Sequence, residues 1–226
     1  MASCVHKHII VLVSLEDYYG VPLLAAEGPA GDVEDFLFDD EAWLVRHLVV
    51  DVGGWVGRRD VAIPISALEK PVWATKTFVT TLTRDAVRRS PGAEQHRPVS
   101  RQQEIAMNQY YGWPAYWRGM SANAELPPVS VAAGREFPVR AGEDPHLRSA
   151  QAVIGYKVWG GDNFIGTLEN LIVDERSWHI GYLDVKTGKW LDKRAVLLPT
   201  RLVTAISWAK HRIRVVDSES KIASLR

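Results

Sequence analysis

Short apolar runs separated by polar turns recur along the chain, and they predict strands. In the first half, such runs occupy residues 21–25, 33–38, 43–50, 61–63 and 78–82. Turn-forming residues separate them: a Gly- and Pro-rich stretch at 27–31, an acidic corner at 39–41 and a turn at 52–57. Five or six short strands at this spacing indicate a small closed barrel, in which no sheet edge is left exposed.

The same pattern occurs twice. An offset of 135 residues, which places residue 20 on residue 155, aligns residues 20–87 with residues 155–222 without a gap. Three tryptophans, three glycines and a proline recur at this offset: Trp43/Trp178, Trp55/Trp190, Trp73/Trp208, Gly20/Gly155, Gly31/Gly166, Gly53/Gly188 and Pro64/Pro199. The repeat predicts two copies of one module. Tryptophan buries a large area, so we expect the recurring ones in the core or at its rim.

The predicted organisation is all-β: two small barrels in tandem, each followed by a short helix. We expect an N-terminal segment at 1–18, barrels at 19–90 and 151–226, and a partly ordered connector at 91–150. The first helix should begin after Thr83, which can cap it, and should end before Pro91, which cannot continue it. Residues 218–225 are predicted to form the equivalent helix.

The connector contains an aromatic cluster. Ser100 opens a capping-box pattern that predicts a short helix to about residue 111, which Gly112 can end. The aromatic residues are Tyr110, Tyr111, Trp113, Tyr116 and Trp117. Disordered tethers are poor in such residues, so the cluster predicts a docking element that fixes two barrels or two chains, or else an exposed partner-binding patch. Residues 121–144, rich in Pro and Gly, predict a loose connection.

The repeated segments resemble a known family. Residues 31–43, 48–55 and 61–64, with 166–169, 182–185 and 196–199 in the second copy, are similar to the PRC-barrel family. Residues 82–85 and 97–101 resemble stretches of bacterial tandem members. The resemblance implies the fold. Family roles include a ribosome-maturation factor and a reaction-centre subunit. Neither role is expected here, because no separate barrel precedes the first module and no membrane helix is predicted.

Composition excludes several classes of function. Lys plus Arg equals Asp plus Glu at 27 each, so nothing draws the whole chain to nucleic acid or an anionic membrane. A single cysteine, Cys4, excludes an internal disulfide and a cysteine-based zinc site, and it fits a cytoplasmic setting. The longest apolar run, residues 9–13, is too short to span a bilayer.

We predict no catalytic, cofactor or metal site. The acidic corner 39–41 could suggest catalysis, but its equivalent at 174–176 has one carboxylate fewer, and acidic residues are ordinary at tight turns. His6 and His8 could share a metal on a strand, but no third ligand is indicated.

Charge is nevertheless uneven along the chain. Residues 31–41 carry six acids and no base, whereas residues 84–101 carry five arginines, so an acidic surface could meet a basic one within the chain or across a homodimer. The basic stretches lack interleaved stacking aromatics, so nucleic acid is not the expected partner. We therefore expect a non-enzymatic binding or assembly protein whose partner is another protein or a second copy. The alternatives are an enzyme that uses the acidic turns and an RNA- or ribosome-associated factor.

Overall fold

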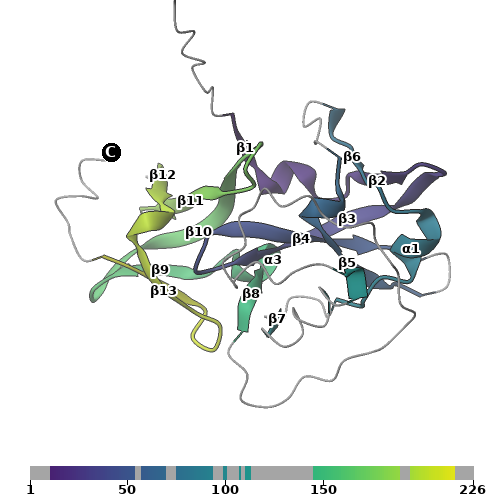
Figure 1. Cartoon of the computed structure of the whole chain (residues 1–226). Coiled ribbons are helices and arrows are strands. Elements are labelled where there is room, and N and C mark those ends of the chain that lie inside the picture. Colours follow the sequence, from purple (N-terminus) through teal and green to yellow (C-terminus); the bar gives the residue numbers. More distant parts are fainter. Residues whose placement is uncertain are drawn as a thin grey trace, which may run out of the picture.

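The computed structural model describes residues 11–53, 57–69, 75–93, 99–100, 107, 110–112, 145–188 and 194–216. These residues form two separate β-sheets, one from each copy of the repeat, and only short helices (Figure 1). The predicted all-β class with tandem modules is therefore confirmed.

The first sheet contains β2 (Pro22–Ala25), β3 (Gly28–Asp39), β4 (Leu44–Asp51), β5 (Asp60–Pro64) and β6 (Phe78–Val79), in the order β5-β4-β3-β2-β6. Two strands near the ends of the connector join it, β7 (Val99–Ser100) and β8 (Pro145–Ser149). The helices in the first copy of the sequence are η1 (Leu15–Tyr18), η2 (Ile65–Ala67) and α1 (Arg84–Arg88), of which η1 contacts β10 (Asn163–Asp174) of the second sheet. The hydroxyl of Thr83 accepts a hydrogen bond from the Ala86 N–H, so the predicted cap is confirmed.

The second sheet repeats this plan. It contains β9 (Lys157–Gly160), β10 (Asn163–Asp174), β11 (Ile180–Thr187), β12 (Arg194–Pro199), β13 (Val203–Ser207) and β14 (Arg212–Val215), in the order β12-β11-β10-β9-β14-β13. The second copy of the sequence contains two short helices, α3 (Ala150–Val153), which contacts β3 of the first sheet, and η5 (Thr200–Leu202), which contacts β11. β3 and β10 begin and end at equivalent positions, which confirms the repeat.

Each sheet receives a strand from the segment that precedes the other copy. β1 (Leu12–Ser14) leads into the first module but pairs with β10 of the second, with Leu12 opposite Asp174. β8 leads into the second module but pairs with β3 of the first, with Leu147 opposite Asp39. These registers coincide at the offset of the repeat, so the exchange is reciprocal. Figure 1 shows the purple β1 among the green strands of the second sheet.

A pseudo-two-fold axis passes between the modules. Leu44 forms an antiparallel bridge with His179, which is its own equivalent in the second copy. On either side of this bridge, the carbonyls of Trp43 and Trp178 accept hydrogen bonds from the backbone of the other module, at 2.7 and 3.0 Å. The two modules therefore meet through the same residues from both sides, as two subunits of a symmetric dimer do.

The tryptophans at this axis adopt an unusual backbone. Trp43 and Trp178 have φ angles of 52° and 62°, a region that bulky residues seldom enter. Both are buried, at 8% and 6% exposure, as predicted. The ring of Trp178 packs in the first module, with its centroid 6.4 Å from Phe36 and 5.8 Å from Phe78. Trp55, Trp73 and Trp190 lie outside the described residues.

The shared core extends through both modules. One continuous cluster of buried apolar residues includes side chains from β3 and β4 and from β10 and β11. Glycine recurs beside it for a steric reason: a Cβ on Gly31 or Gly166 would clash with the backbone of the neighbouring strand at Asp51 or Lys186. Strand exchange and a common core make the two modules one structural unit.

Three details differ from the sequence-based expectation. The turn predicted at 27–31 is confined to residues 26–27, and β3 already begins at Gly28, because a positive φ of 111° lets this glycine follow the turn directly. The strand predicted at 78–82 is only the short β6, because Thr83 and the residues before it lead into α1. Ser100 lies in β7, and the described helical residues beyond it are Met107, Tyr110 and Tyr111. The helix predicted at 218–225 lies outside the described residues.

Candidate functional site

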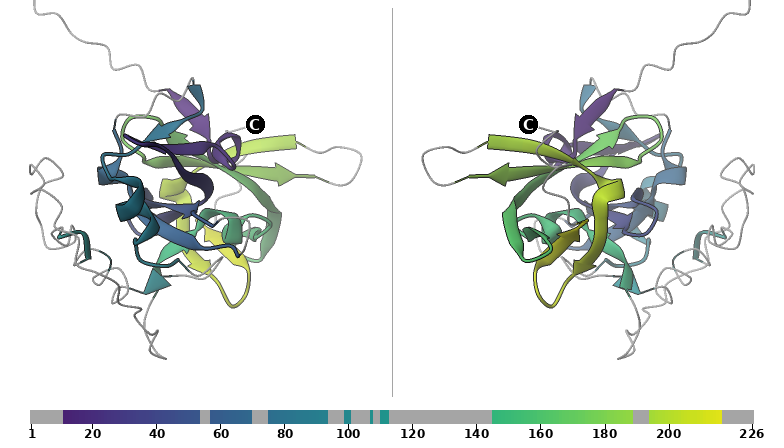
Figure 2. Two further views of the ribbon diagram at one scale, coloured as in Figure 1. Left: turned by 90° about the vertical axis from the view of Figure 1, so that its right-hand side faces the viewer. Right: turned by 90° about the vertical axis from the view of Figure 1, so that its left-hand side faces the viewer.

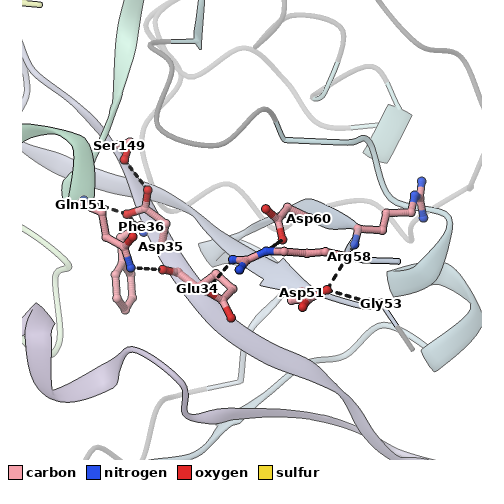
Figure 3. A network of polar contacts seen from close by, with 10 residues as sticks. Glu34, Asp35, Phe36, Asp51, Gly53, Arg58, Asp60, Ser149 and Gln151 are labelled. Carbon is pink, nitrogen blue, oxygen red and sulfur yellow. Dashed lines mark hydrogen bonds and ion pairs between the residues drawn. The ribbon is translucent and has the colours of Figure 1, made fainter. Parts of the chain in front are cut away.

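Buried polar links hold the exchanged strand β8 on the first sheet (Figure 3). The Asp35 carboxylate, 4% exposed, accepts hydrogen bonds from the Ser149 hydroxyl and the Gln151 backbone N–H. The side-chain amide of Gln151 donates to the carbonyl of Glu34. A desolvated carboxylate is costly unless donors surround it, so these contacts are what permit Asp35 to lie in the interface.

The second sheet holds β1 with the same link in inverted form. Asn170 is the equivalent of Asp35, and its amide donates to the Ser14 hydroxyl and to the Glu16 carboxylate, 3.0 Å away. Acid and amide therefore exchange places between the two links. If two first modules paired with each other, Asp35 would meet Glu16, and two carboxylates would lie together at this link. The side chains thus favour pairing of a first with a second module.

The acidic corners are engaged in turn chemistry. One oxygen of Asp39 accepts the backbone N–H groups of Glu41 and Ala42, both at 3.0 Å. Asp174 does the same for the N–H groups two and three residues further on. The acidic stretch also makes ion pairs within the described residues, in which Glu34 pairs with Arg58 (Figure 3). The backbone hydrogen bonds of Asp39 and Asp174 are those predicted for carboxylates at tight turns.

The face of the first sheet that points away from the shared core is covered by the connector. The residues of this face form a second buried cluster with Met107, and none of them is more than 5% exposed: Leu37, Val49, Ala62 and Leu147. Ala93 packs against the same cluster. We call this the covered face.

The edge of the first sheet, β5, is covered as well. The Ala62 N–H donates to the Pro91 carbonyl at 3.0 Å, and the Ala93 N–H donates to the Asp60 carbonyl at 2.9 Å. The Tyr111 hydroxyl donates to the Ala62 carbonyl at 2.8 Å. Both outward-pointing backbone groups of Ala62 therefore have partners, and the edge presents no unpaired group there.

The equivalent face of the second sheet is open. Leu12 and Leu197 stand where the first module has buried Leu147 and Ala62, and they are 43% and 46% exposed. Between them, Asp184 occupies the place of Val49. We call the surface formed by Leu12, Ile172, Tyr182, Asp184 and Leu197 the open face.

The edge of the second sheet, β12, is also uncovered. In an antiparallel ladder, hydrogen-bonded and non-hydrogen-bonded pairs alternate. The ladder of β11 and β12 has the register of β4 and β5, so the backbone groups of Ala195 and Leu197 point outward, as those of Asp60 and Ala62 do. No residue in the described part of the chain pairs with them. Figure 2 shows that the β11–β12 hairpin projects from the body of the molecule.

Asp184 gives the open face its own electrostatic character. Partial burial raises the pKa of its carboxyl, and the negative charge of Glu169 raises it further, whereas Lys186 lowers it. No described residue donates a hydrogen bond to this carboxylate. A molecule that covered the face would have to supply a donor or a cation here.

The predicted aromatic cluster is described only in part. Tyr110 and Tyr111 are buried against the first module, and the hydroxyl of Tyr110 donates to the Arg89 carbonyl at 2.7 Å. Trp113, Tyr116 and Trp117 lie outside the described residues, so docking by the whole cluster stays a prediction. The contacts between the modules described above come from the exchanged strands and the short helices beside them, from residues 43–45 and 178–180, and from the common core.

Sequence reasoning did not identify the open face. Its signal was present in the repeat, because Asp184 and Leu197 replace the smaller or apolar Val49 and Ala62 at equivalent positions. The sequence did not show which residues cover the first module. Tyr111 and Pro91 belong to the connector, and neither has a counterpart within the aligned copies.

Within the described residues, no group of three or more His, Cys, Asp or Glu side chains could hold a metal ion, and no helix is long and apolar enough to cross a membrane.

Comparison with known proteins places the chain in a family. No curated protein matches the chain. The family model of the PRC-barrel domain matches residues 16–83 and 146–222, more than half of the 226 residues. The chain therefore belongs to the PRC-barrel family and carries two of its domains in tandem.

Proposed function

We propose that this protein is a non-enzymatic assembly protein that binds another protein through the open face of its second PRC-barrel domain. The observation that carries the proposal is the contrast between two equivalent faces: one is buried beneath the chain's own connector, and the other exposes Leu12 and Leu197. The first module supplies an internal example of how this surface is used when it is covered.

The energetics support a binding role. Complete burial of a leucine side chain contributes roughly 1.5–3 kcal/mol, and two leucines on one face offer a partner an apolar anchor. Charged surfaces that bind nucleic acid need cations along a phosphate backbone. The open face instead has a carboxylate, Asp184, between exposed leucines, which suits a protein partner better than RNA.

An enzymatic role has weaker support. Catalysis needs groups that converge on one reacting centre. The carboxylates of Asp39 and Asp174, the strongest candidates in the sequence, bind backbone N–H groups of their own turns.

Site-specific crosslinking in the source organism tests the proposal. A photoreactive residue is placed at Leu197 or Leu12 of the full chain, and the matched control carries it at Thr204, an exposed residue of β13. We expect a discrete crosslinked protein from the two leucine positions and none from Thr204. Absence of a crosslink at both leucines, or the same products at all three positions, would contradict the proposal.

A further inference from the structure

We propose that the partner binds by β-strand addition: an extended segment of another protein pairs with the outer edge of β12 and lays an apolar side chain and a cationic group over the open face. This inference rests on the proposed function and names its mode of recognition. The first module carries the argument, because it shows the equivalent edge already occupied.

The edge of β12 has the geometry that strand addition needs. On β5, the added segment is residues 91–93, and it exchanges hydrogen bonds with Ala62 and Asp60. The same outward groups on β12 belong to Leu197 and Ala195, and both residues are exposed. Extended peptides that join a sheet edge gain affinity from such main-chain hydrogen bonds and specificity from alternate side chains.

The open face defines the side chains of the segment. In the first module, the connector packs Met107 against Ala62 and its neighbours, and the Tyr111 hydroxyl donates to the Ala62 carbonyl at the edge. A partner that covers Leu197 therefore needs a comparable apolar or aromatic side chain. It also needs Arg or Lys opposite Asp184, since a carboxylate covered without a donor would oppose binding.

A different protein fits this surface better than a second copy of the chain. The chain's own segments with suitable chemistry, residues 91–93 with Tyr111, are held on the first module. A second copy that approached with its own open face would bring another Asp184, not the cation that the surface requires.

Random short peptides displayed on phage provide the probe, selected against the intact chain. We expect enriched sequences that contain an apolar or aromatic residue and Arg or Lys. A synthetic enriched peptide should shift the amide NMR signals of Ala195 and Leu197. The Leu197→Pro variant should weaken its binding at least about tenfold, because proline removes an outward N–H and spares the ladder with β11. Asp184→Asn should weaken peptides that carry the cation.

The peptide itself supplies the matched control. One version of the peptide is N-methylated on its odd-numbered residues and the other on its even-numbered residues. Because successive residues of a strand point in opposite directions, only one of these two sets of N–H groups can face β12. We expect one version to lose binding and the other to keep it, a result that does not depend on how well the proline variant folds. Equal behaviour of the two versions, failure to enrich any peptide, or NMR shifts elsewhere would overturn the inference.

Two further outcomes separate this inference from the proposed function. If the host protein still crosslinks at Leu12 in the Leu197→Pro variant with undiminished yield, the open face binds a partner without strand addition, and only this inference fails. If light scattering shows a dimer of the chain that Leu197→Pro dissociates, a second copy occupies the edge, and the assigned partner is wrong.

Discussion

The two outer faces of this protein have the same strands in the same register, yet one is buried and the other is exposed. Ala62 and Leu197 occupy equivalent positions, and the first is fully buried whereas the second is 46% exposed. The strands alone therefore do not decide what a PRC-barrel face does. The segments that lie outside the repeated unit decide it, and in this chain they cover one copy only.

The substitution with the largest expected effect tests whether the two modules unfold together or independently. Trp178→Ala should destabilise the chain by about 3–5 kcal/mol, because it leaves a cavity beside Phe36 and Phe78 of the other module. Urea unfolding followed by circular dichroism should remain a single transition. Two separate transitions, with the first module unaffected, would show that the shared core does not couple the modules.

A matched pair of substitutions tests the faces directly. Ala62→Lys should cost about 3 kcal/mol or more, because it forces a charge and extra volume into a closed cluster. Leu197→Lys at the equivalent position should change stability by less than about 0.5 kcal/mol, as exposed substitutions usually do. Thermal unfolding of both variants measures the difference. Similar losses would mean that the second face is covered in solution.

The inverted polar links sharpen the comparison between the copies. Gln151→Glu should destabilise the chain by about 1–3 kcal/mol, because it removes the amide that donates to the Glu34 carbonyl and brings a second carboxylate close to buried Asp35. Adding Asp35→Asn should restore part of this loss, since the first link then matches the pattern of Asn170 and Glu16 in the second. Urea unfolding of the single and double variants tests this. If the double variant lost as much stability as the two single variants together, acid and amide would not be interchangeable between the two links.

The last expected effect concerns pH. His47 lies fully buried on the covered face, and burial, with a contribution from Arg46, lowers its pKa to about 3. The unfolded chain, with a pKa of about 6.5, then binds more protons, so stability falls as pH drops below that value, by at most about 1.4 kcal/mol per pH unit. His47→Gln should flatten this dependence above about pH 5, where most carboxylates remain ionised. Parallel curves for wild type and variant would place the titration elsewhere.

The repeat predicted the fold because its signals are local. The apolar runs, the turn residues and the Thr83 cap each act within one module, and the structure confirms the cap and the burial of Trp43 and Trp178. The exchange of β1 and β8 could not be predicted in the same way. A strand of three residues such as Leu12–Ser14 is too short for its sequence pattern to identify the strand with which it pairs. Pairing between distant segments depends on the whole fold.

The candidate site was harder still. An exposed leucine carries no meaning by itself, because many apolar residues lie at protein surfaces. Leu197 becomes informative only when buried Ala62 is known to hold the same place beneath a cover. That comparison requires knowing where Tyr111 lies. The sequence predicted that Tyr111 belongs to a docking element, but it did not predict that this residue contacts β5.

The reciprocal exchange of strands has a consequence for how the chain is made. The hydrogen bond between Asp35 and Ser149 joins residues 114 apart in sequence, and the one between Ser14 and Asn170 joins residues 156 apart. During synthesis, the first module emerges before β8 exists, so the edge of β3 at Leu37 and Phe38 waits unpaired. Contacts of such long range form late and slowly, and unpaired edges attract other chains. The nascent first module is therefore the species most exposed to aggregation, and release of the second module ends that exposure.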